Sequence, residues 1–466
     1  MLNIIFVIDT LSYADHIAIA CLSAVAKQKG HMTHFCLLSN SDLRTLVLKI
    51  KPDIVAYSAN VLSFKNIVKN HKDSMSAHQF ISILGGPQAT FFPESFSESC
   101  VDAYCVGEGE EAFGEFLDRV ENKESFDDVL NLITNKRSNP VRPLISDLDL
   151  LPALDRDLIL SNSFLGNVSK KTFYATRGCP YACSYCCNNY YHDLYRHKGK
   201  TIRRFSVERV IQEIEHVKKN YKTDFVKFGD DIFAIRADNW MREFVQKYKS
   251  RIGLPFNCYL RFDIVTDELL TMLSEAGCYS VHLSVDSTSP YVREHVLNRR
   301  MRKNVDIEYN LCKIRSHNIR TWVNYMLSAP ESTIRDDINT IFMSKKGKVT
   351  YTAYSITTPM NGTKLYEESL RKGYIDSNFV GDMTGGNGLT EYSSPSSLKC
   401  FSQREKDIQY NIYCLGAIAA KLPYSLLYIC LAIIILIPPN VFFLKLRNLY
   451  HKFMVERYIF KVDDHP

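Results

Sequence analysis

The chain has 466 residues, of which 46% are hydrophobic and 23% charged, so it can bury a sizeable core, and bulk disorder is not expected. Its length exceeds what one core usually supports, which predicts two or three units. The 57 basic and 51 acidic residues leave a net charge of +6 without a long basic run, so no nucleic-acid partner is expected. The fourteen cysteines lack regular spacing outside one cluster, which favours a reducing cytoplasm over a disulfide-bonded secreted protein.

Residues 1–125 alternate short apolar runs with helical patterns, which predicts a Rossmann-like, doubly wound α/β domain. The first nine residues lack a basic segment and a cleavage site, so they are interpreted as a buried strand and not as a signal peptide. No loop spells the G-x-G-x-x-G fingerprint, so nicotinamide binding is disfavoured. The predicted strands are 4–8, 33–37, 54–57, 81–84 and 103–106.

Periodicity weakens over residues 126–170, where several prolines indicate a linker. A second α/β unit over residues 171–375 is predicted to be a partial (βα)6 barrel. In barrels the chemistry lies at the carboxyl-terminal ends of the strands, so the residues just after each strand are the candidates for function. The predicted strands are 173–176, 225–228, 256–260, 280–285, 321–327 and 352–357.

Residues 376–466 are predicted to be mostly helical, with a capping box from Ser402 to Glu405 opening one helix. The segment 422–444 carries no charge, but Pro438-Pro439 interrupts it, and basic residues follow closely. Three interpretations stay open for this segment: a buried helix, a helix lying on a membrane surface, and a membrane span.

Three cysteines stand within eight residues, on the loop after the first strand of the predicted barrel: Cys179, Cys183 and Cys186. Three thiolates at short spacing suit a 4Fe-4S cluster that keeps one iron open, because a tight loop can wrap the cluster. A structural zinc site would need a fourth ligand, for which Cys187 and His192 are the nearest candidates. Three unrelated buried cysteines are the remaining alternative.

The pattern Cys-x-x-x-Cys-x-x-Cys, with Tyr185 before the last cysteine, resembles the signature of the radical S-adenosylmethionine (SAM) superfamily. The resemblance implies that the three thiolates hold a 4Fe-4S cluster and that SAM binds its open iron. Reductive cleavage of SAM then yields a 5′-deoxyadenosyl radical, which removes hydrogen from an unactivated carbon. No catalytic side chain is assigned with certainty.

Further segments are similar to the same family and imply a SAM site. Asp230 and Asp231 resemble its acidic turn after the second strand, although Asp231 could instead cap a helix. Asp286 and Ser287 stand where relatives commonly show Glu-Ser. Arg299 resembles a basic residue that meets the SAM carboxylate, and a solvated arginine is the alternative.

The N-terminal unit resembles the cobalamin-binding domain that precedes many radical SAM barrels. The resemblance rests on two loops, Gly85-Gly86-Pro87 and Gly107-Glu108-Gly109, whose glycines let backbone approach a bulky ligand or serve plain turns. No Asp-x-His-x-x-Gly motif occurs, which implies cobalamin without histidine ligation or an empty, vestigial domain.

Together these resemblances imply a cobalamin-dependent radical SAM enzyme that methylates an unactivated carbon of a small or hydrophobic substrate. The alternatives are a radical cyclase or oxidoreductase of the anaerobic tetrapyrrole type and a non-catalytic iron-sulfur sensor or electron carrier. A flavodoxin- or ferredoxin-type protein is the expected electron donor. A cytoplasmic location is expected, with peripheral membrane contact through 422–444 as one possibility.

Overall fold

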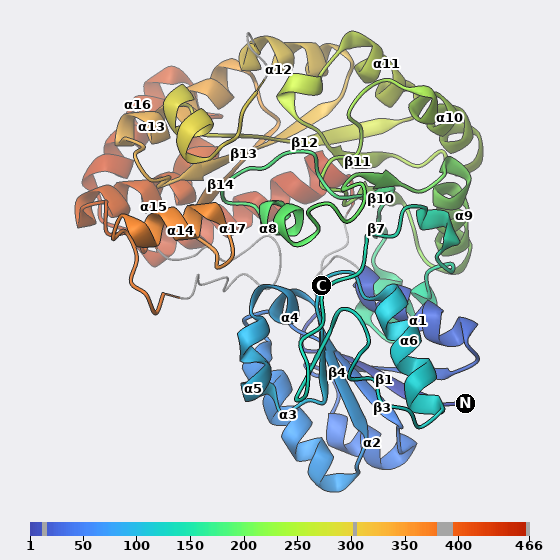
Figure 1. Ribbon diagram of the computed structural model, residues 1–466. Coiled ribbons are helices and arrows are strands. Elements are labelled where there is room, and N and C mark those ends of the chain that lie inside the picture. The colour runs from blue at the N-terminus through green and yellow to red at the C-terminus, as the bar shows by residue number, and fades with distance from the viewer. Residues whose placement is uncertain (12–15, 302–304, 380–394, 463–466) are drawn as a thin grey trace.

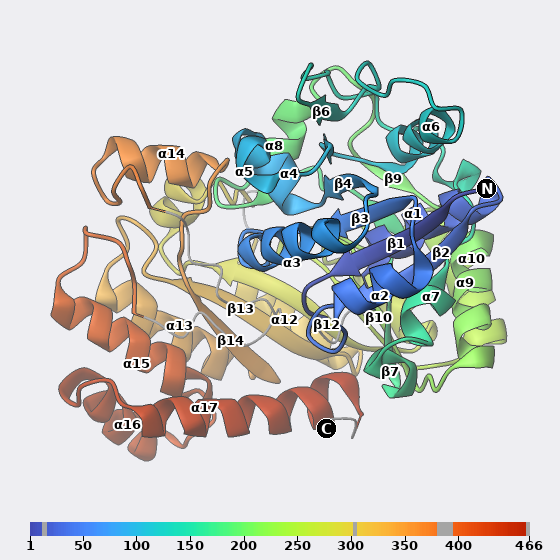
Figure 2. The same ribbon diagram turned by 90° about the horizontal axis from the view of Figure 1, so that it is seen from below.

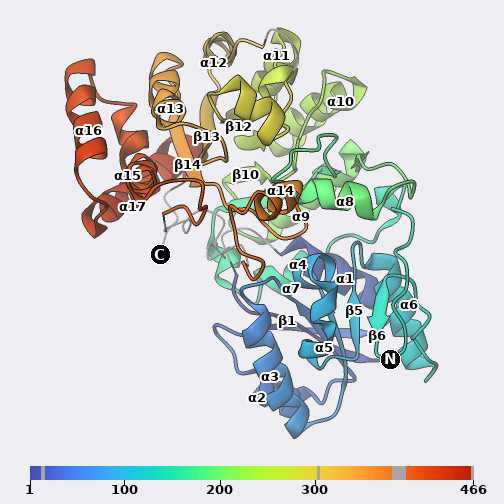
Figure 3. The same cartoon turned by 60° about the vertical axis from the view of Figure 1, so that its left-hand side comes forward.

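The computed structural model describes residues 1–11, 16–301, 305–379 and 395–462, which form two α/β units and a C-terminal group of helices (Figure 1). The N-terminal unit lies below the second in that view. Helix α8 (Cys187–Leu194) lies between the two units, as the rotated view also shows (Figure 3). The chain segment that follows the cysteine cluster therefore runs along the interface.

The N-terminal domain is a doubly wound sheet of six strands in the order β2-β1-β3-β4-β5-β6, which confirms the predicted fold class. All neighbouring pairs are parallel except β5 with β6. Each of the five predicted strands is present within one residue of its expected bounds. The elements are β1 (Asn3–Ile8), α1 (Ile17–Gln28), β2 (Met32–Leu37), α2 (Leu43–Ile50), β3 (Ile54–Ser58), α3 (Phe64–Ala77), β4 (Ile81–Gly85), α4 (Pro87–Phe91), α5 (Phe96–Ser99), β5 (Ala103–Cys105), α6 (Glu110–Glu121) and β6 (Leu132–Thr134).

Strand β1 contributes side chains to two hydrophobic clusters, because successive side chains of a strand point to opposite faces of the sheet. Ile4, Phe6 and Ile8 join a cluster that continues into the second unit. Ile5 and Val7 join a separate cluster on the other face of the sheet. Helices cover both faces, so the strand is apolar throughout, as is usual in parallel sheets.

The segment 126–170 is more than the linker that the sequence predicts. It supplies β6, whose antiparallel pairing makes the first sheet one strand wider than expected. It also packs on α1, where Asp155 accepts a hydrogen bond from Ser23 (2.5 Å) and forms an ion pair with Lys27 (2.7 Å). The short helix α7 (Arg156–Leu160) follows. Weak periodicity hid these elements because each is only three to five residues long.

The second unit is a six-stranded parallel sheet in the order β14-β13-β12-β11-β10-β7, the arrangement of a partial βα barrel. Helices connect consecutive strands, as the sequence predicts. The strands are β7 (Lys170–Phe173), β10 (Phe225–Phe228), β11 (Phe256–Tyr259), β12 (Cys278–Asp286), β13 (Arg320–Leu327) and β14 (Tyr351–Ile356), and the helices are α9 (Val207–Asn220), α10 (Asn239–Lys247), α11 (Asp267–Glu275), α12 (Ile307–Ser316) and α13 (Ile334–Lys346).

The first strand of this sheet lies three residues earlier than its predicted range, 173–176, and the two overlap only at Phe173. Strand β7 ends at Phe173 because the Asp230 carboxylate accepts hydrogen bonds from the backbone N–H groups of Ala175 and Thr176, which are thus lost to strand pairing. The chain pairs again over β8 (Thr176–Arg177), antiparallel to β9 (Arg203–Arg204).

Helix α14 (Lys364–Arg371) follows β14, and the described part of 376–466 is mostly helical, as predicted: α15 (Gln403–Ala419), α16 (Tyr424–Leu436), α17 (Val441–Met454) and the π-helix η7 (Val455–Phe460). The predicted capping box is present, since Ser402 and Glu405 exchange side-chain to backbone hydrogen bonds. Helix α15 packs along β14, and α16 and α17 lie outside it at the margin of the molecule (Figure 2).

The apolar segment 422–444 is not the buried helix that was one interpretation of the sequence. Only one side of α16 is covered, through Leu427, Leu431 and Ile434, and most of its other apolar side chains are exposed. Among the described residues, none of the helices has both the length and the apolar character needed to cross a bilayer.

Candidate functional site

The three clustered cysteines lie on one loop between β8 and α8, at the carboxyl-terminal end of β7. Asp230, which follows β10, fixes the start of this loop: its Oδ1 accepts from the N–H of Ala175 (2.9 Å) and from the N–H (2.5 Å) and hydroxyl (2.7 Å) of Thr176. His192 fixes the other side, with Nε2 2.7 Å from the Cys179 carbonyl oxygen. The loop is therefore held by two neighbouring elements before any cofactor binds.

The thiols lie close enough for each to influence another's ionisation. Burial, and then the neighbouring Asp231, Cys186 and Cys183, raise the pKa of Cys179 to about 11. Burial also raises the pKa of Cys183, against the effect of Arg299. A hydrogen bond from Cys187 lowers the pKa of Cys186 to about 7. Iron binds thiolates, so metal binding has to displace protons here.

These residues fit a cubane cluster. Each thiolate of such a cluster binds a different iron, so the ligands need not converge on one point. Among the described residues, no three His, Cys, Asp or Glu side chains are placed to hold a single metal ion. Of the two candidate fourth zinc ligands, His192 contacts the loop backbone and Cys187 is the first residue of α8.

Three residues that the sequence predicts for SAM binding meet beside Cys183. The Asp286 carboxylate forms an ion pair with the Arg299 guanidinium (2.6 Å) and accepts a hydrogen bond from the Tyr185 hydroxyl (2.6 Å). Arg299 also lies 3.3 Å from that hydroxyl and 3.9 Å from the Cys183 sulfur. Burial alone would lower the pKa of Arg299, but Asp286, Tyr185 and Cys183 together outweigh burial and the pKa is raised, so the guanidinium is charged. The alternative of a solvated arginine is wrong, because Arg299 is buried.

Asp286 reaches this position through local backbone geometry. Its φ is +66°, which is uncommon for a residue with a side chain, and the register of β12 with β13 shifts between Ser284 and Asp286. The Ser284 hydroxyl contacts the same carboxylate. The strand end therefore turns Asp286 toward Tyr185 and Arg299.

The other three predicted SAM residues are placed differently. Asp230 is buried and bonds to the cysteine loop itself, and Ser287 is buried, with its hydroxyl accepting from the N–H of Ser289 (3.2 Å). Asp231 borders a cavity beside Asn188. It caps no helix, because the N-cap of the next helix, α10, is Asp238. The helix-cap interpretation of Asp231 is therefore wrong.

A cavity of about 460 Å³ lies between the two α/β units, within the range of roughly 300–1,000 Å³ that ligand sites usually have. Both predicted glycine loops border it, 85–87 from the end of β4 and 107–109 from the start of α6. Asn188, Tyr191 and Tyr195 of the interface helix and its end border the opposite side. The described residues that line the cavity include no histidine.

Glycine is required at two of these loop positions. Gly107 has φ +78°, and a Cβ there would lie 2.0 Å from the Tyr195 hydroxyl, which accepts a hydrogen bond from the N–H of Glu108 (2.6 Å). Gly86 has φ +88°, and a Cβ would lie 2.9 Å from the Ala59 carbonyl oxygen. The loops thus bring backbone close to neighbouring groups at the edge of a large cavity, which fits a bulky ring cofactor.

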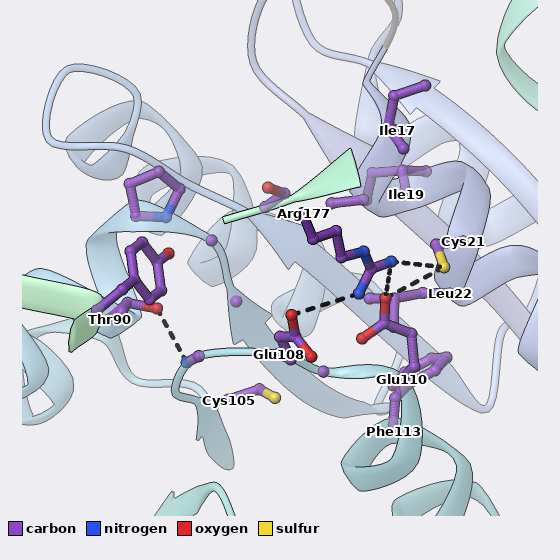
Figure 4. Close-up of a pocket in the computed structure, with 18 of the residues that line it drawn as sticks. Ile17, Ile19, Cys21, Leu22, Thr90, Cys105, Glu108, Glu110, Phe113 and Arg177 are labelled. Atoms are coloured by element: carbon purple, nitrogen blue, oxygen red, sulfur yellow. Dashed lines mark hydrogen bonds and ion pairs between the residues drawn. The ribbon is translucent and has the colours of Figure 1, made fainter. Parts of the chain in front are cut away.

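Ion pairs join the two units along this cavity (Figure 4). Arg177 of β8 pairs with Glu110 of α6 (2.6 Å) and more distantly with Glu108 (3.6 Å). Arg203 of β9 pairs with Glu108 through two hydrogen bonds (2.5 and 2.9 Å). The Cys21 thiol of α1 donates to Glu110 (3.2 Å).

Sequence reasoning missed this network of Arg177, Arg203, Glu110, Cys21 and Tyr195. Arg177 stands two residues before Cys179, and Glu110 directly follows the Gly107-Glu108-Gly109 loop, so both adjoin motifs that the sequence reveals. Their pairing was hidden because it joins residues 67 positions apart, and no local pattern records such a contact.

Comparison with known proteins agrees with this geometry. Residues 5–117 match the B12 binding domain, and residues 173–337 match the radical SAM superfamily. An uncharacterized methyltransferase, PH0819 of Pyrococcus horikoshii, is 25% identical over 342 residues, 72% of each chain. An anaerobic magnesium-protoporphyrin IX monomethyl ester cyclase of Rubrivivax gelatinosus is 22% identical over 351 residues, 71% of this chain and 61% of its own.

The structure of the cobalamin-dependent SAM radical enzyme OxsB with aqua-cobalamin bound has the same fold, with a TM-score of 0.69 at 14% identity over 97% of this chain and 75% of its own. Residues 173–337 thus form a radical SAM domain, and a B12-binding domain over residues 5–117 precedes it. These two domains make it a radical SAM enzyme whose cofactors are a 4Fe-4S cluster, SAM and cobalamin.

Proposed function

We propose that the protein transfers a methyl group to an unactivated carbon of a small or hydrophobic substrate. One SAM molecule would serve as the radical source and a second as the methyl source. The observation that carries the proposal is the interdomain cavity, which borders the glycine loops on one side and the start of α8, directly after the cluster cysteines, on the other. A substrate placed there would lie between the two cofactors, as methyl transfer to a radical carbon requires.

The residue roles follow from the contacts. Cys179, Cys183 and Cys186 would hold the cluster, and the bound cofactors supply one-electron cleavage of SAM and a carrier for the methyl group. Arg299, Asp286 and Tyr185 form a charged, hydrogen-bonded group beside Cys183, suited to the amino and carboxylate groups of SAM. Asp231, at the cavity edge, is proposed to contact SAM directly.

Asp230 and Ser287 are proposed to act on SAM through the backbone that they hold. Asp230 orients the start of the cysteine loop, and the Ser287 carbonyl oxygen accepts a hydrogen bond from Arg293 (3.1 Å). Both are positioning residues in this proposal, since both are buried against the chain.

For cobalamin, the proposed contacts are backbone groups of Gly85, Gly86, Gly107 and Gly109, together with Pro87 and Glu108. Glu108 is already paired with Arg203, so its contribution would be to fix the loop and not to carry free charge into the cavity. The mostly apolar walls would exclude water from a reactive radical.

A radical cyclase is the alternative, and the name of the relative from Pyrococcus horikoshii favours methyl transfer over it. Product labelling separates the two. The protein, reconstituted without oxygen with iron, sulfide and hydroxocobalamin, would receive methyl-labelled SAM, flavodoxin as electron donor and a metabolite extract. We expect 5′-deoxyadenosine and S-adenosylhomocysteine together, with label in one extract component. An unlabelled cyclised or oxidised product, formed with 5′-deoxyadenosine alone, would support the cyclase.

The cluster assignment has a matched control within the motif. Alanine at Cys179, Cys183 or Cys186 is expected to remove the visible absorption and the paramagnetic signal of the reduced cluster. Cys187→Ala changes the adjacent thiol and is expected to keep both. Equal loss in all four variants would mean that the loop merely unfolds, and retention in all four would refute the ligand set.

A further inference from the structure

Helices α16 and α17 present an exposed apolar surface that the chemistry of the active site does not use. Its most exposed members are Leu436 (70%), Phe442 (69%) and Leu449 (70%), and Leu426, Ile429 and Ile433 extend it along α16. We call these six residues the tail face. Isolated apolar side chains are normal on protein surfaces, but six exposed apolar side chains on two consecutive helices mark an interaction site.

The pattern of α16 explains why the tail face is exposed. The helix packs on the protein through Leu427, Leu431 and Ile434, which recur at the spacing of one helix face. A helix at a water-facing surface would carry polar residues on the other side. Between Tyr424 and Leu436, however, only Ser425 is a small polar residue, and the rest are apolar or aromatic apart from Cys430. The outer side is thus built for an apolar surrounding.

The charged residues of the segment that carries the tail face have one sign. No acidic residue occurs between Asp407 and Glu456, whereas Lys421, Lys445, Arg447 and Lys452 lie in that stretch. Lys445 and Lys452 are exposed, and seven residues, or about two turns, separate them on α17, so they point to the same side. Within the described part of the chain, neither has an ion-pair partner.

We propose that the tail face docks on an anionic lipid bilayer, with α16 and α17 lying in the interface and the lysines reaching headgroup phosphates. Amphipathic surfaces that combine apolar side chains with flanking Lys and Arg bind membranes in this way. The 13 residues of α16 span about 20 Å, less than the roughly 30 Å of a hydrocarbon core, so the helix would lie in the surface and not across it.

A second copy of the chain is the less favourable occupant. A twofold contact places the same patch of each copy face to face, so Lys445 and Lys452 would approach their own counterparts without acidic residues to offset them. Anionic headgroups remove that repulsion. The proposal is independent of the reaction: α16 and α17 lie outside α15, which packs on β14, whereas the cysteine loop follows β7 at the opposite edge of the sheet.

Flotation of the full, reconstituted chain with lipid vesicles tests the proposal. We expect binding to vesicles of phosphatidylcholine with phosphatidylglycerol, weaker binding to pure phosphatidylcholine, and loss of the difference in high salt. Lys445→Gln and Lys452→Gln should each weaken binding to the anionic vesicles roughly fivefold. Leu436→Glu with Phe442→Glu should abolish binding to both. Leu48→Glu, at a half-exposed position on α2 of the other domain, is the matched control and should bind like the wild type.

The absorption of the iron-sulfur cluster shows whether each variant is folded. If the double glutamate variant does not fold, binding of the two lysine variants to anionic vesicles tests the proposal. The proposal is overturned if the wild-type chain does not float with anionic vesicles, or if Leu48→Glu loses as much binding as the tail-face variants. The proposal is also overturned by two results together. In these, sedimentation shows that the wild type is a dimer which Leu436→Glu with Phe442→Glu dissociates, and the wild type does not bind vesicles. Release of 5′-deoxyadenosine should be unchanged in the lysine variants and in the tail-face variant. Failure of the membrane proposal would therefore leave the proposed reaction unaffected.

Discussion

Arg177 of the radical SAM domain and Glu110 of the B12-binding domain form an ion pair of 2.6 Å at the wall of the cavity where the two domains meet. The Glu110 side chain is only 8% exposed and that of Arg177 21% exposed, so the pair is largely removed from water. Burial would raise the pKa of Glu110, but the charge and hydrogen bond of Arg177, together with hydrogen bonds from the Glu110 backbone and Cys21, outweigh burial and the pKa is lowered. The charge of one domain is therefore balanced by the other, and the domains are coupled at the site they share.

Removing one partner of this pair should be costly. Arg177→Met leaves a buried carboxylate unpaired, and we expect a loss of about 3 kcal/mol in the free energy of unfolding, the low end for buried pairs because Arg177 keeps some exposure. Adding Glu110→Gln should recover part of the loss, since both charges are then gone. Urea unfolding of both single variants and the double variant measures the coupling. Strictly additive effects would show that the two side chains do not interact.

The Gly107 loop should be intolerant of a side chain. Gly107→Ala combines a positive φ with a Cβ that would lie 2.0 Å from the Tyr195 hydroxyl, so the ring must move and release the Glu108 N–H. Gly30→Ala is the matched control, because Gly30 has φ +83° in the same domain but nothing within 4 Å of its Cβ position. We expect Gly30→Ala to cost roughly 1–2 kcal/mol of stability and keep cobalamin affinity.

Gly107→Ala should lower the free energy of unfolding by more than Gly30→Ala does, and it should weaken cobalamin binding. The absorption change on titration with hydroxocobalamin measures the binding. If both alanine variants bind cobalamin equally well, the 107–109 loop does not contact the cofactor.

The two sheets could be predicted from the sequence because their strands are continuous apolar runs, such as Ile4–Ile8. Such a run indicates a buried strand even when its partner strands are not known. The cysteine loop was accessible because its ligands are local. The end of β7 could not be predicted from the sequence, because it depends on the Asp230 carboxylate, which binds the N–H of Ala175, 55 residues away. Strand β6, three residues long in a segment of weak periodicity, carries too little pattern to detect.

The tail shows a different limit of sequence reasoning. An apolar segment such as 422–444 indicates that its surroundings are apolar. Its sequence does not indicate whether the rest of the protein, a membrane or a partner supplies those surroundings. Burial against the protein was one interpretation, and the structure covers only the side of α16 that carries Leu427, Leu431 and Ile434. In the same way, Arg299 could be assigned to the SAM site by resemblance, but its ion pair with Asp286 required the fold.

The Asp286 carboxylate should control SAM binding through Arg299 and Tyr185. Asp286→Asn keeps the left-handed backbone, which asparagine tolerates, and removes only the charge. We expect SAM to bind about tenfold more weakly or worse, because a charged hydrogen-bonded group is lost. Tyr185→Phe, which removes one hydrogen bond to Asp286, should have a smaller effect in the same direction.

The change that SAM causes in the paramagnetic spectrum of the reduced cluster reports this binding. Asp238→Asn serves as the control, because Asp238 also pairs with an arginine, Arg204 (2.8 Å), but caps α10 away from the cysteines. An unaltered SAM titration in Asp286→Asn would exclude Asp286 from the SAM site.

Asp337 joins the C-terminal helices to the barrel. It is buried on α13, where its carboxylate accepts from the Gln409 amide of α15 (3.0 Å), and burial raises its pKa to about 7. An unfolded chain releases this proton near the usual aspartate pKa of about 4, so between about pH 4 and 7 the folded chain holds a proton that the unfolded chain has lost. Stability should therefore fall as the pH rises through this window, by up to roughly 1.4 kcal/mol per pH unit, and then level off.

Asp337→Asn keeps an acceptor for Gln409 and cannot ionise. We expect it to match the wild type near pH 4 and to be more stable above pH 7, as measured by urea unfolding across the range. Asp336→Asn, which changes a partly exposed neighbour in the capping box of α13, controls for loss of a carboxylate from this helix. If the difference between Asp337→Asn and the wild type is the same at every pH, the Asp337 carboxylate does not hold a proton in the folded protein, and its bond to Gln409 must be that of an ionised group.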